Sequence, residues 1–152
     1  MVTDSPFTTE NPVFANFVFY ATIVVLKMML MSGITAAYRI TNKVFINPED
    51  ASSFGKQTKL VTNNPGVERI RRCHLNDLEN VIPFVLIGLL YVATGPSLSS
   101  ALLHFRLFAG SRLAHTVVYL LAVPQPARAI LFTVGILATA SMAVSTLLAV
   151  SF

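Results

Sequence analysis

Four long apolar stretches alternate with polar segments along the chain. They cover about residues 13–38, 75–93, 98–121 and 127–150. Each approaches or exceeds the roughly 20 apolar residues that an α-helix needs to cross a bilayer. The pattern therefore predicts an all-α integral membrane protein, a bundle of four transmembrane helices forming one domain over residues 1–152.

Only the first connection between these stretches is long. Thr94-Gly-Pro-Ser97 predicts a tight turn, and the prolines of Val123-Pro-Gln-Pro126 suit the start of the last helix. Residues 40–68 form the one real loop, with turn or cap signals at Asn47-Pro-Glu-Asp50 and Asn63-Asn-Pro-Gly66.

Charge is sparse and unevenly placed. Hydrophobic residues make up 54% of the chain and charged residues 12%, against roughly 25% charged in ordinary soluble domains. Seven of the eleven Lys and Arg fall between Arg39 and Arg72, so the positive-inside rule places the loop at 40–68 in the cytosol and both termini across the membrane. The net charge of +4 is accompanied by no nucleic-acid motif. The first apolar stretch is too long for a signal peptide, and we expect it to remain as an anchor.

Two stripes of polar side chains enter the predicted membrane helices. At helical spacing each stripe lies on one face: Arg69, Arg72, Asn76 and Glu79 in the first, and Arg112, His115 and Tyr119 in the second. Polar groups at this depth are costly and usually face a protein interior or an aqueous cavity. The alternative for the arginines is an interfacial helix end from which they snorkel to water. The stripes together predict a polar pocket that opens on the cytosolic side.

Charged groups inside the bundle need partners. For Arg112 the first candidate is Glu79 and the second is Asp77. Lys27 is expected to pair with Asp77 as a structural bridge. For His104 and Arg106 we expect no role beyond lining a subunit interior.

Nine candidate site residues gather toward the cytosolic half. They are Arg39, Arg72, His74, Asn76, Glu79, Arg112, His115, Tyr119 and Arg128. Such a set suits a small polyanionic ligand with one amine, because arginines bind carboxylates bidentately and a glutamate accepts an ammonium. The chain has no Gly-rich phosphate loop and no HExxH motif, so nucleotide and metalloprotease chemistry have no support and no metal is expected.

A family resemblance rests on these same residues. Val67-Glu-Arg-Ile-Arg-Arg-Cys-His-Leu-Asn-Asp-Leu-Glu-Asn80 resembles the glutathione-binding motif of the membrane-associated proteins in eicosanoid and glutathione metabolism (MAPEG). Four further motifs match the family pattern in order: Phe45-Ile-Asn-Pro-Glu-Asp50, Leu103-His-Phe-Arg-Leu-Phe108, His115-Thr-Val-Val-Tyr119 and Pro124-Gln-Pro-Ala-Arg128.

The resemblance implies a four-helix, multi-pass subunit of a homotrimer in the endoplasmic reticulum (microsomal) and mitochondrial outer membranes. Glutathione, the co-substrate, would bind between neighbouring subunits near the cytosolic face. The nine residues above match the family's glutathione site, and Arg128 matches its catalytic arginine. A free thiol has a pKa of about 8.5, and a neighbouring cation shifts it toward the nucleophilic thiolate.

The implied function is detoxification by a membrane-bound glutathione transferase. It would conjugate glutathione to hydrophobic electrophiles and reduce lipid hydroperoxides as a peroxidase. One alternative is a glutathione-dependent prostaglandin E synthase-like isomerase, which has Arg and Ser where this chain has Leu75 and Ala129. Another is a non-catalytic lipid-presenting membrane protein, which the complete arginine set disfavours. Ala51 stands where the family's mammalian transferases have a cysteine, and Cys73 is interpreted as a small packed residue.

Overall fold

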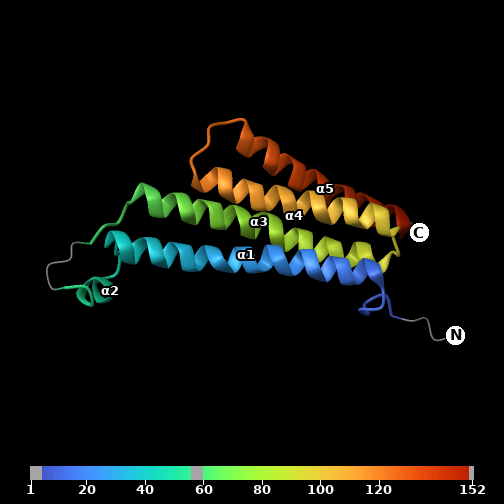
Figure 1. Ribbon diagram of the computed structural model, residues 1–152, viewed down its shortest axis with the longest axis horizontal. Helices are drawn as coiled ribbons and strands as arrows, with labels where there is room; N and C mark the ends of the chain where they lie inside the picture. The colour runs from blue at the N-terminus through green and yellow to red at the C-terminus, as the bar shows by residue number, and fades with distance from the viewer. Residues whose placement is uncertain (1–4, 56–59, 151–152) are drawn as a thin grey trace.

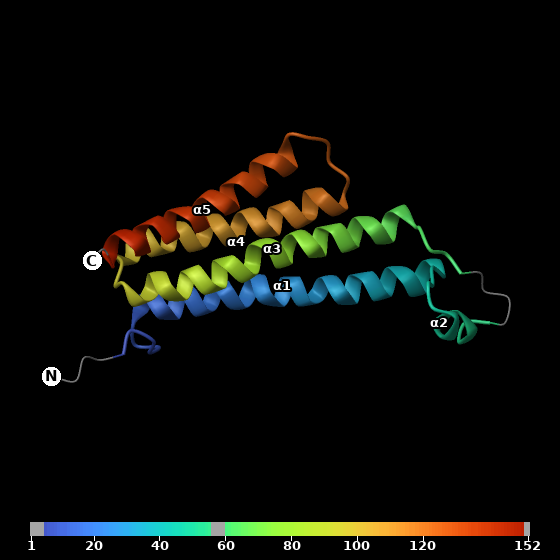
Figure 2. The same cartoon turned by 180° about the vertical axis from the view of Figure 1, so that it is seen from behind.

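The computed structural model describes residues 5–55 and 60–150, and these residues are helical almost throughout. The helices are α1 (Pro12–Asn42), α2 (Pro48–Ser52), α3 (Pro65–Ala93), α4 (Leu98–Leu120) and α5 (Ala127–Ala149). The four long helices lie side by side in an elongated antiparallel bundle (Figure 1). The start of α1 and the end of α5 lie at one end, and the short α2 lies beyond the other (Figure 2). No strand occurs in the described part, only an isolated bridge between Phe45 and Leu60.

Helix α3 begins well before the apolar stretch predicted at 75–93. The Asn64 side chain accepts hydrogen bonds from the backbone N–H groups of Gly66 and Val67, at 2.9 and 3.1 Å. Pro65 occupies the first helical position, where its missing N–H costs nothing. The polar segment that follows is therefore helical, and the expected loop at 40–68 is shortened at its end and interrupted by α2.

Three of the helices are long and apolar enough to cross a membrane: α1, α3 and α5. Helix α4 has the same length as α5, 23 residues, but it is not one of these three helices. Two arginines and two histidines lower its mean hydropathy. The class predicted from the sequence, an all-α membrane protein, is supported, although only three of the four expected spans meet this criterion.

An aromatic core fills the half of the bundle where α1 begins. The rings of Phe84 (α3) and Phe108 (α4) stack with centroids 3.8 Å apart. Phe17 (α1) lies 5.5 Å from Phe105 (α4) and packs over Gly88 of α3. A side chain at Gly88 would collide with that ring, so the glycine permits α1 and α3 to approach closely.

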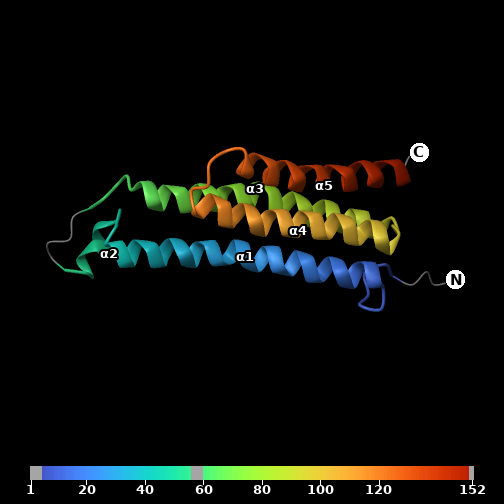
Figure 3. The same cartoon turned by 45° about the horizontal axis from the view of Figure 1, so that its top comes forward.

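Helix α5 joins the bundle over only part of its length. Its buried residues are Gly135, Ala138 and Met142, and none lies in its first two turns. The His104 ring of α4 is hydrogen-bonded to the Ser141 hydroxyl at 2.9 Å. The other end of α5, at Ala127, diverges from α4 (Figures 1 and 2), and the 121–126 connection that joins the two helices loops outward there (Figure 3). The divergence leaves room between α3, α4 and α5 at the end nearest the 121–126 connection.

Candidate functional site

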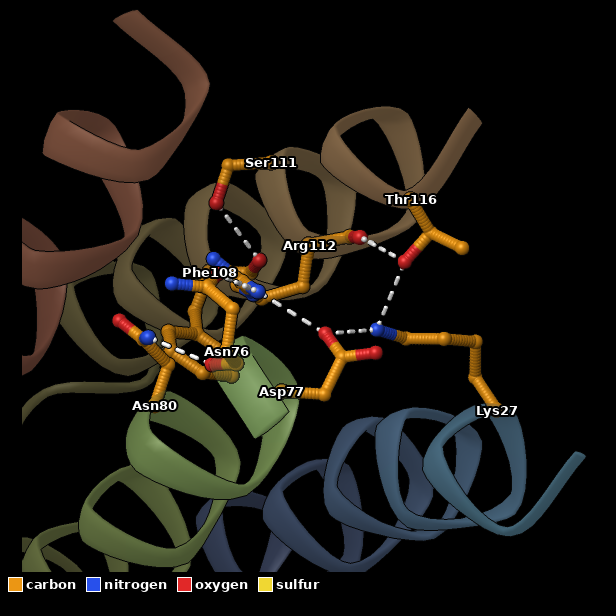
Figure 4. A network of polar contacts seen from close by, with 8 residues as sticks. All are labelled: Lys27, Asn76, Asp77, Asn80, Phe108, Ser111, Arg112 and Thr116. Carbon is orange, nitrogen blue, oxygen red and sulfur yellow. Dashed lines mark hydrogen bonds and ion pairs between the residues drawn. The ribbon is translucent and has the colours of Figure 1, made fainter. Parts of the chain in front are cut away.

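A buried ionic cluster joins α1, α3 and α4 near the middle of the bundle. Oδ1 of Asp77 accepts hydrogen bonds from Lys27 Nζ and, at 2.9 Å, from Arg112 Nη2 (Figure 4). The expected Lys27–Asp77 bridge is confirmed. The prediction that Arg112 pairs with Glu79 is wrong, because its partner is Asp77, the second candidate. Glu79 lies two residues beyond Asp77, about 200° around the helix, and is exposed.

Neutral side chains extend this cluster on both sides. Lys27 Nζ also donates to the Thr116 hydroxyl at 3.0 Å, and that hydroxyl donates to the Arg112 carbonyl at 3.1 Å. On the other side Arg112 Nη2 donates to Asn76 Oδ1 at 2.7 Å (Figure 4). Because its amide oxygen is engaged, Asn76 retains its NH₂ group as a donor for a ligand.

The cluster carries an uncompensated positive charge. Two cations share one carboxylate, and Arg112 and Asp77 are fully buried. Within the described residues, Nε and Nη1 of Arg112, Oδ2 of Asp77 and Nδ1 of His115 are buried without a hydrogen-bond partner. Buried unpaired polar atoms cost free energy and call for a structural or functional explanation. The surplus charge makes the adjacent space favourable for an anion.

That space is a cavity of about 380 Å³ between α3, α4 and the start of α5. Its lining residues are Asn76, His115, Tyr119, Gln125, Arg128, Ala129 and Phe132. The guanidinium carbon of Arg128 lies 5.1 Å from the centre of the Tyr119 ring, which in turn lies 5.5 Å from the His115 ring. A guanidinium over an aromatic face is held without its hydrogen-bonding edge being used. The cavity thus combines a cation, a phenol, an imidazole and an amide.

Five of the nine candidate residues converge here: Asn76, His115, Tyr119 and Arg128 on the cavity wall, with Arg112 bonded behind Asn76. The other four lie elsewhere on the single chain. Arg39 lines a separate cavity of about 300 Å³ at the end of α1, together with Phe45, Asp50 and Phe54.

The remaining three residues are on α3. Glu79 lines an apolar groove of about 290 Å³ between α3 and α5. Arg72 is exposed and His74 is half-buried, and neither lines the cavity of Asn76 and Arg128.

Two lining residues, Gln125 and Phe132, were not predicted as site residues, and Ala129 was considered only as a difference from the prostaglandin E synthase branch. A signal for Gln125 was available, because it stands in the proline-rich segment just before Arg128. Its Oε1 accepts a hydrogen bond from the Ala129 N–H at 3.2 Å, within the otherwise uncapped first turn of α5. Phe132 follows Arg128 by one helical turn and therefore shares its face. Among the described residues, no three His, Cys, Asp or Glu side chains are grouped as a metal site.

Comparisons with known proteins show what this chain is similar to. The model of the MAPEG family matches residues 17–148. Microsomal glutathione S-transferase 1 from Sus scrofa is 57% identical over 137 residues, and the match covers 88% of each chain. The Homo sapiens protein of the same name is 56% identical over 137 residues, again with 88% of each chain covered. Prostaglandin E synthase from Homo sapiens is 38% identical over 138 residues, covering 91% of this chain and 90% of its own.

Proposed function

The chain belongs to the MAPEG family, and on that premise we propose that it is a membrane-bound glutathione transferase. The identity to relatives named glutathione S-transferase is markedly higher than the identity to those named prostaglandin E synthase. The observation that carries the proposal is the cavity in which Arg128, Tyr119, His115 and Asn76 meet beside a buried positive charge.

Glutathione has two carboxylates, one ammonium, two peptide groups and a thiol. The candidate residues offer partners for the carboxylates, the ammonium and a peptide carbonyl, and Arg128 is proposed for the thiol. The arginines bind carboxylates, Glu79 accepts the ammonium, and Asn76 donates to a peptide carbonyl. Arg39, Arg72, His74 and Glu79 lie outside the cavity of the single chain. We propose that a homotrimer completes the site, with glutathione held between neighbouring subunits.

The proposed arrangement has four spans, with α4 as the fourth. Helix α4 packs against membrane-spanning helices, so Arg112, His115 and Thr116 are buried and shielded from lipid. The connections at 43–64 and 121–126 then face the cytosol, at the endoplasmic reticulum and the mitochondrial outer membrane. A cysteine at exposed Ser53, in a Cys73→Ala background, should react with a membrane-impermeant reagent from the cytosolic side of sealed microsomes. Reaction only after permeabilisation would reverse the orientation.

Arg128 is the proposed catalytic residue. It lies in the first turn of α5, where backbone N–H groups add partial positive charge. Both effects lower the pKa of a thiol bound beside it. The thiolate sulfur then attacks the electrophilic carbon of a lipophilic acceptor, and the leaving group departs with the bonding pair. With a lipid hydroperoxide, two glutathione molecules yield the disulfide, the lipid alcohol and water.

An isomerase of the prostaglandin E synthase type is less well supported. Ala129 lines the cavity next to Arg128, and it offers no hydroxyl where the resemblance gives that branch a serine. A transferase needs only the thiolate and an apolar approach for its acceptor.

The test is an ultraviolet pH titration of the glutathione complex. Arg128→Leu should retain glutathione but lose thiolate absorbance near neutral pH, together with most conjugation to a halogenated nitroarene. Each pKa unit is worth about 1.4 kcal/mol, so a shift of one unit changes the thiolate fraction severalfold. Arg128→Lys should keep part of both signals, because charge survives while the planar fork does not.

Lys43→Gln is the control. Lys43 is exposed at the end of α1 and does not line the cavity of Asn76 and Arg128, so its loss should leave the titration unchanged. An Arg128→Leu complex that titrates like the unmodified protein would remove Arg128 from the thiol.

A further inference from the structure

Arg106 has no part in the site described above. It projects from α4 onto the outside of the bundle, in the half that holds the aromatic core. Its Nε donates to the Tyr20 hydroxyl of α1 at 3.2 Å. Within the part of the chain that the structure describes, its two terminal nitrogens form no hydrogen bond or ion pair. A guanidinium is therefore presented outward with most of its donors unused.

The surface around Arg106 is apolar. Leu103 is 58% exposed and Leu107 is 44% exposed. With Ser99, Leu102 and Arg106 they line a shallow cavity of about 470 Å³. Gly110 follows on the same helix, and a side chain there would meet nothing within 4 Å. Beyond the cavity the exposed surface of α4 is also apolar, because Leu113 is exposed, and an acyl chain requires such a surface.

The depth of Arg106 in the membrane determines which kind of group must reach its side chain. It stands six residues before Arg112 in α4, and Tyr20 stands seven before Lys27 in α1, so along the helix axes this pair lies about 9–11 Å from the ionic cluster. Helical side chains lean toward the N-terminus, so Arg106 reaches toward Ser99 and the α3–α4 turn. An arginine at such a level is costly in lipid unless an anion or water reaches it.

We propose that Arg106, Tyr20 and Ser99 bind the phosphate of an anionic phospholipid in the leaflet on the side of the α3–α4 turn. The terminal guanidinium nitrogens bind phosphate oxygens bidentately. The Tyr20 oxygen accepts from Arg106 and so keeps its own O–H to donate. One acyl chain lies over Leu103 and Leu107.

A second copy of the chain fits this surface less well. A copy in the same orientation presents its residues at the same depth. The nearest exposed carboxylate at mid-bundle is Glu79, two residues beyond Asp77, and it leans toward the N-terminus of α3, away from the level of Arg106. The lack of a nearby carboxylate also disfavours a zwitterionic headgroup. No described acidic group near Arg106 would accept the ammonium of such a lipid. A lipid with a net negative headgroup pairs with Arg106 through its phosphate and needs no acidic partner from the protein.

The experiment is lipid titration of the detergent-purified full chain, read by native mass spectrometry. Phosphatidylglycerol and phosphatidylcholine with identical acyl chains are the probes. The unmodified protein should retain phosphatidylglycerol in preference. Arg106→Gln should weaken its binding about tenfold, as for the loss of a charged hydrogen bond, and Tyr20→Phe should weaken it less. Arg71→Gln is the control and should bind as the unmodified protein does.

Three outcomes would overturn the proposal. They are equal phosphatidylglycerol binding before and after Arg106→Gln, equal binding of both lipids by the unmodified protein, and a changed subunit number in Arg106→Gln with lipid binding intact. The last result would assign the surface to a second copy. Inorganic phosphate should not displace the lipid, because it lacks the acyl chain. If Arg106→Gln does not fold, Leu107→Trp fills the cavity with the charge intact, and retained lipid in that variant would equally refute the site.

Discussion

The two halves of the bundle solve the problem of burial in opposite ways. In the half where α1 begins, Phe17, Phe84, Phe105 and Phe108 fill the interior with aromatic rings. From the middle of the bundle toward the other end, the interior holds Lys27, Asp77, Arg112 and His115, with several polar atoms unpartnered among the described residues. The aromatic half is held by close packing, whereas the charged half contains unpartnered charged groups at the place where a ligand is proposed to bind.

This contrast explains the shape of α5. The helix is held in the packed half, through Met142 and the His104–Ser141 hydrogen bond, and diverges in the charged half. The cavity exists because the fourth long helix is anchored at only one end. Packing in one half thus positions Arg128 in the other.

Substituting Asp77 should have the largest effect of the changes considered, because it removes the carboxylate on which the charged half depends. Asp77→Ala leaves Lys27 and Arg112 buried without their shared carboxylate, and removing one partner of a buried ion pair costs about 3–5 kcal/mol. Glutathione affinity should fall as well, because Arg112 also holds Asn76. Thermal unfolding in detergent and calorimetry measure the two effects.

The surface pair Glu68–Arg71 is the control for Asp77. Glu68→Gln should change stability by less than about 1 kcal/mol. If Asp77→Ala unfolds at the same temperature as Glu68→Gln, the buried cluster does not stabilise this half.

Substituting Phe84 should lower stability without touching the chemistry. Phe84 is fully buried and stacked on Phe108, and Phe→Ala in a core costs about 3–5 kcal/mol. Folded Phe84→Ala should nevertheless bind glutathione with unchanged affinity. Phe19→Ala, at a side chain that is 57% exposed, is the matched control. A large loss of affinity in Phe84→Ala would show that the two halves are coupled.

Cys73 should give the smallest effect. It is fully buried against Met31 and Ile70, one turn before Asp77. Cys73→Ala should cost about 1 kcal/mol, the value for one buried methylene-sized group. Maleimide should label the native protein only as fast as it opens locally. Rapid labelling with a change in conjugation rate would instead indicate a thiol-sensitive regulatory position.

Hydropathy predicted most of the helices but not their full lengths. The start of α3 depends on the Asn64 cap and Pro65, so the helix extends through polar residues that an apolar count leaves out. Asn47-Pro-Glu-Asp50 was interpreted as a turn or cap signal, and Asn47 is the N-cap of the short α2, which the apolar pattern did not predict. Helix α4 shows the reverse case, since its arginines and histidines depress hydropathy although the helix is as long as α5.

Pairing inside the bundle was only partly predictable. Spacing placed Arg112, His115 and Tyr119 on one face, but it could not distinguish Asp77 from Glu79 as the partner of Arg112. The rotation of α3 decides between them, and tertiary packing fixes that rotation. Gln125 and Phe132 were missed because their role depends on how the 121–126 connection turns α5 back toward α3.

The sharing of one carboxylate by two cations has a consequence for biogenesis. Lys27 is synthesised first and enters the membrane on a helix apolar enough to carry it, since one lysine at a helix centre costs about 2.5–3.5 kcal/mol during insertion. Asp77 follows and neutralises it. Helix α4, with Arg106 and Arg112, inserts last of the three and does so against a carboxylate already in place. Glycosylation mapping of truncated nascent chains should therefore show efficient insertion of α4 when α3 carries Asp77, and poor insertion when that residue is alanine.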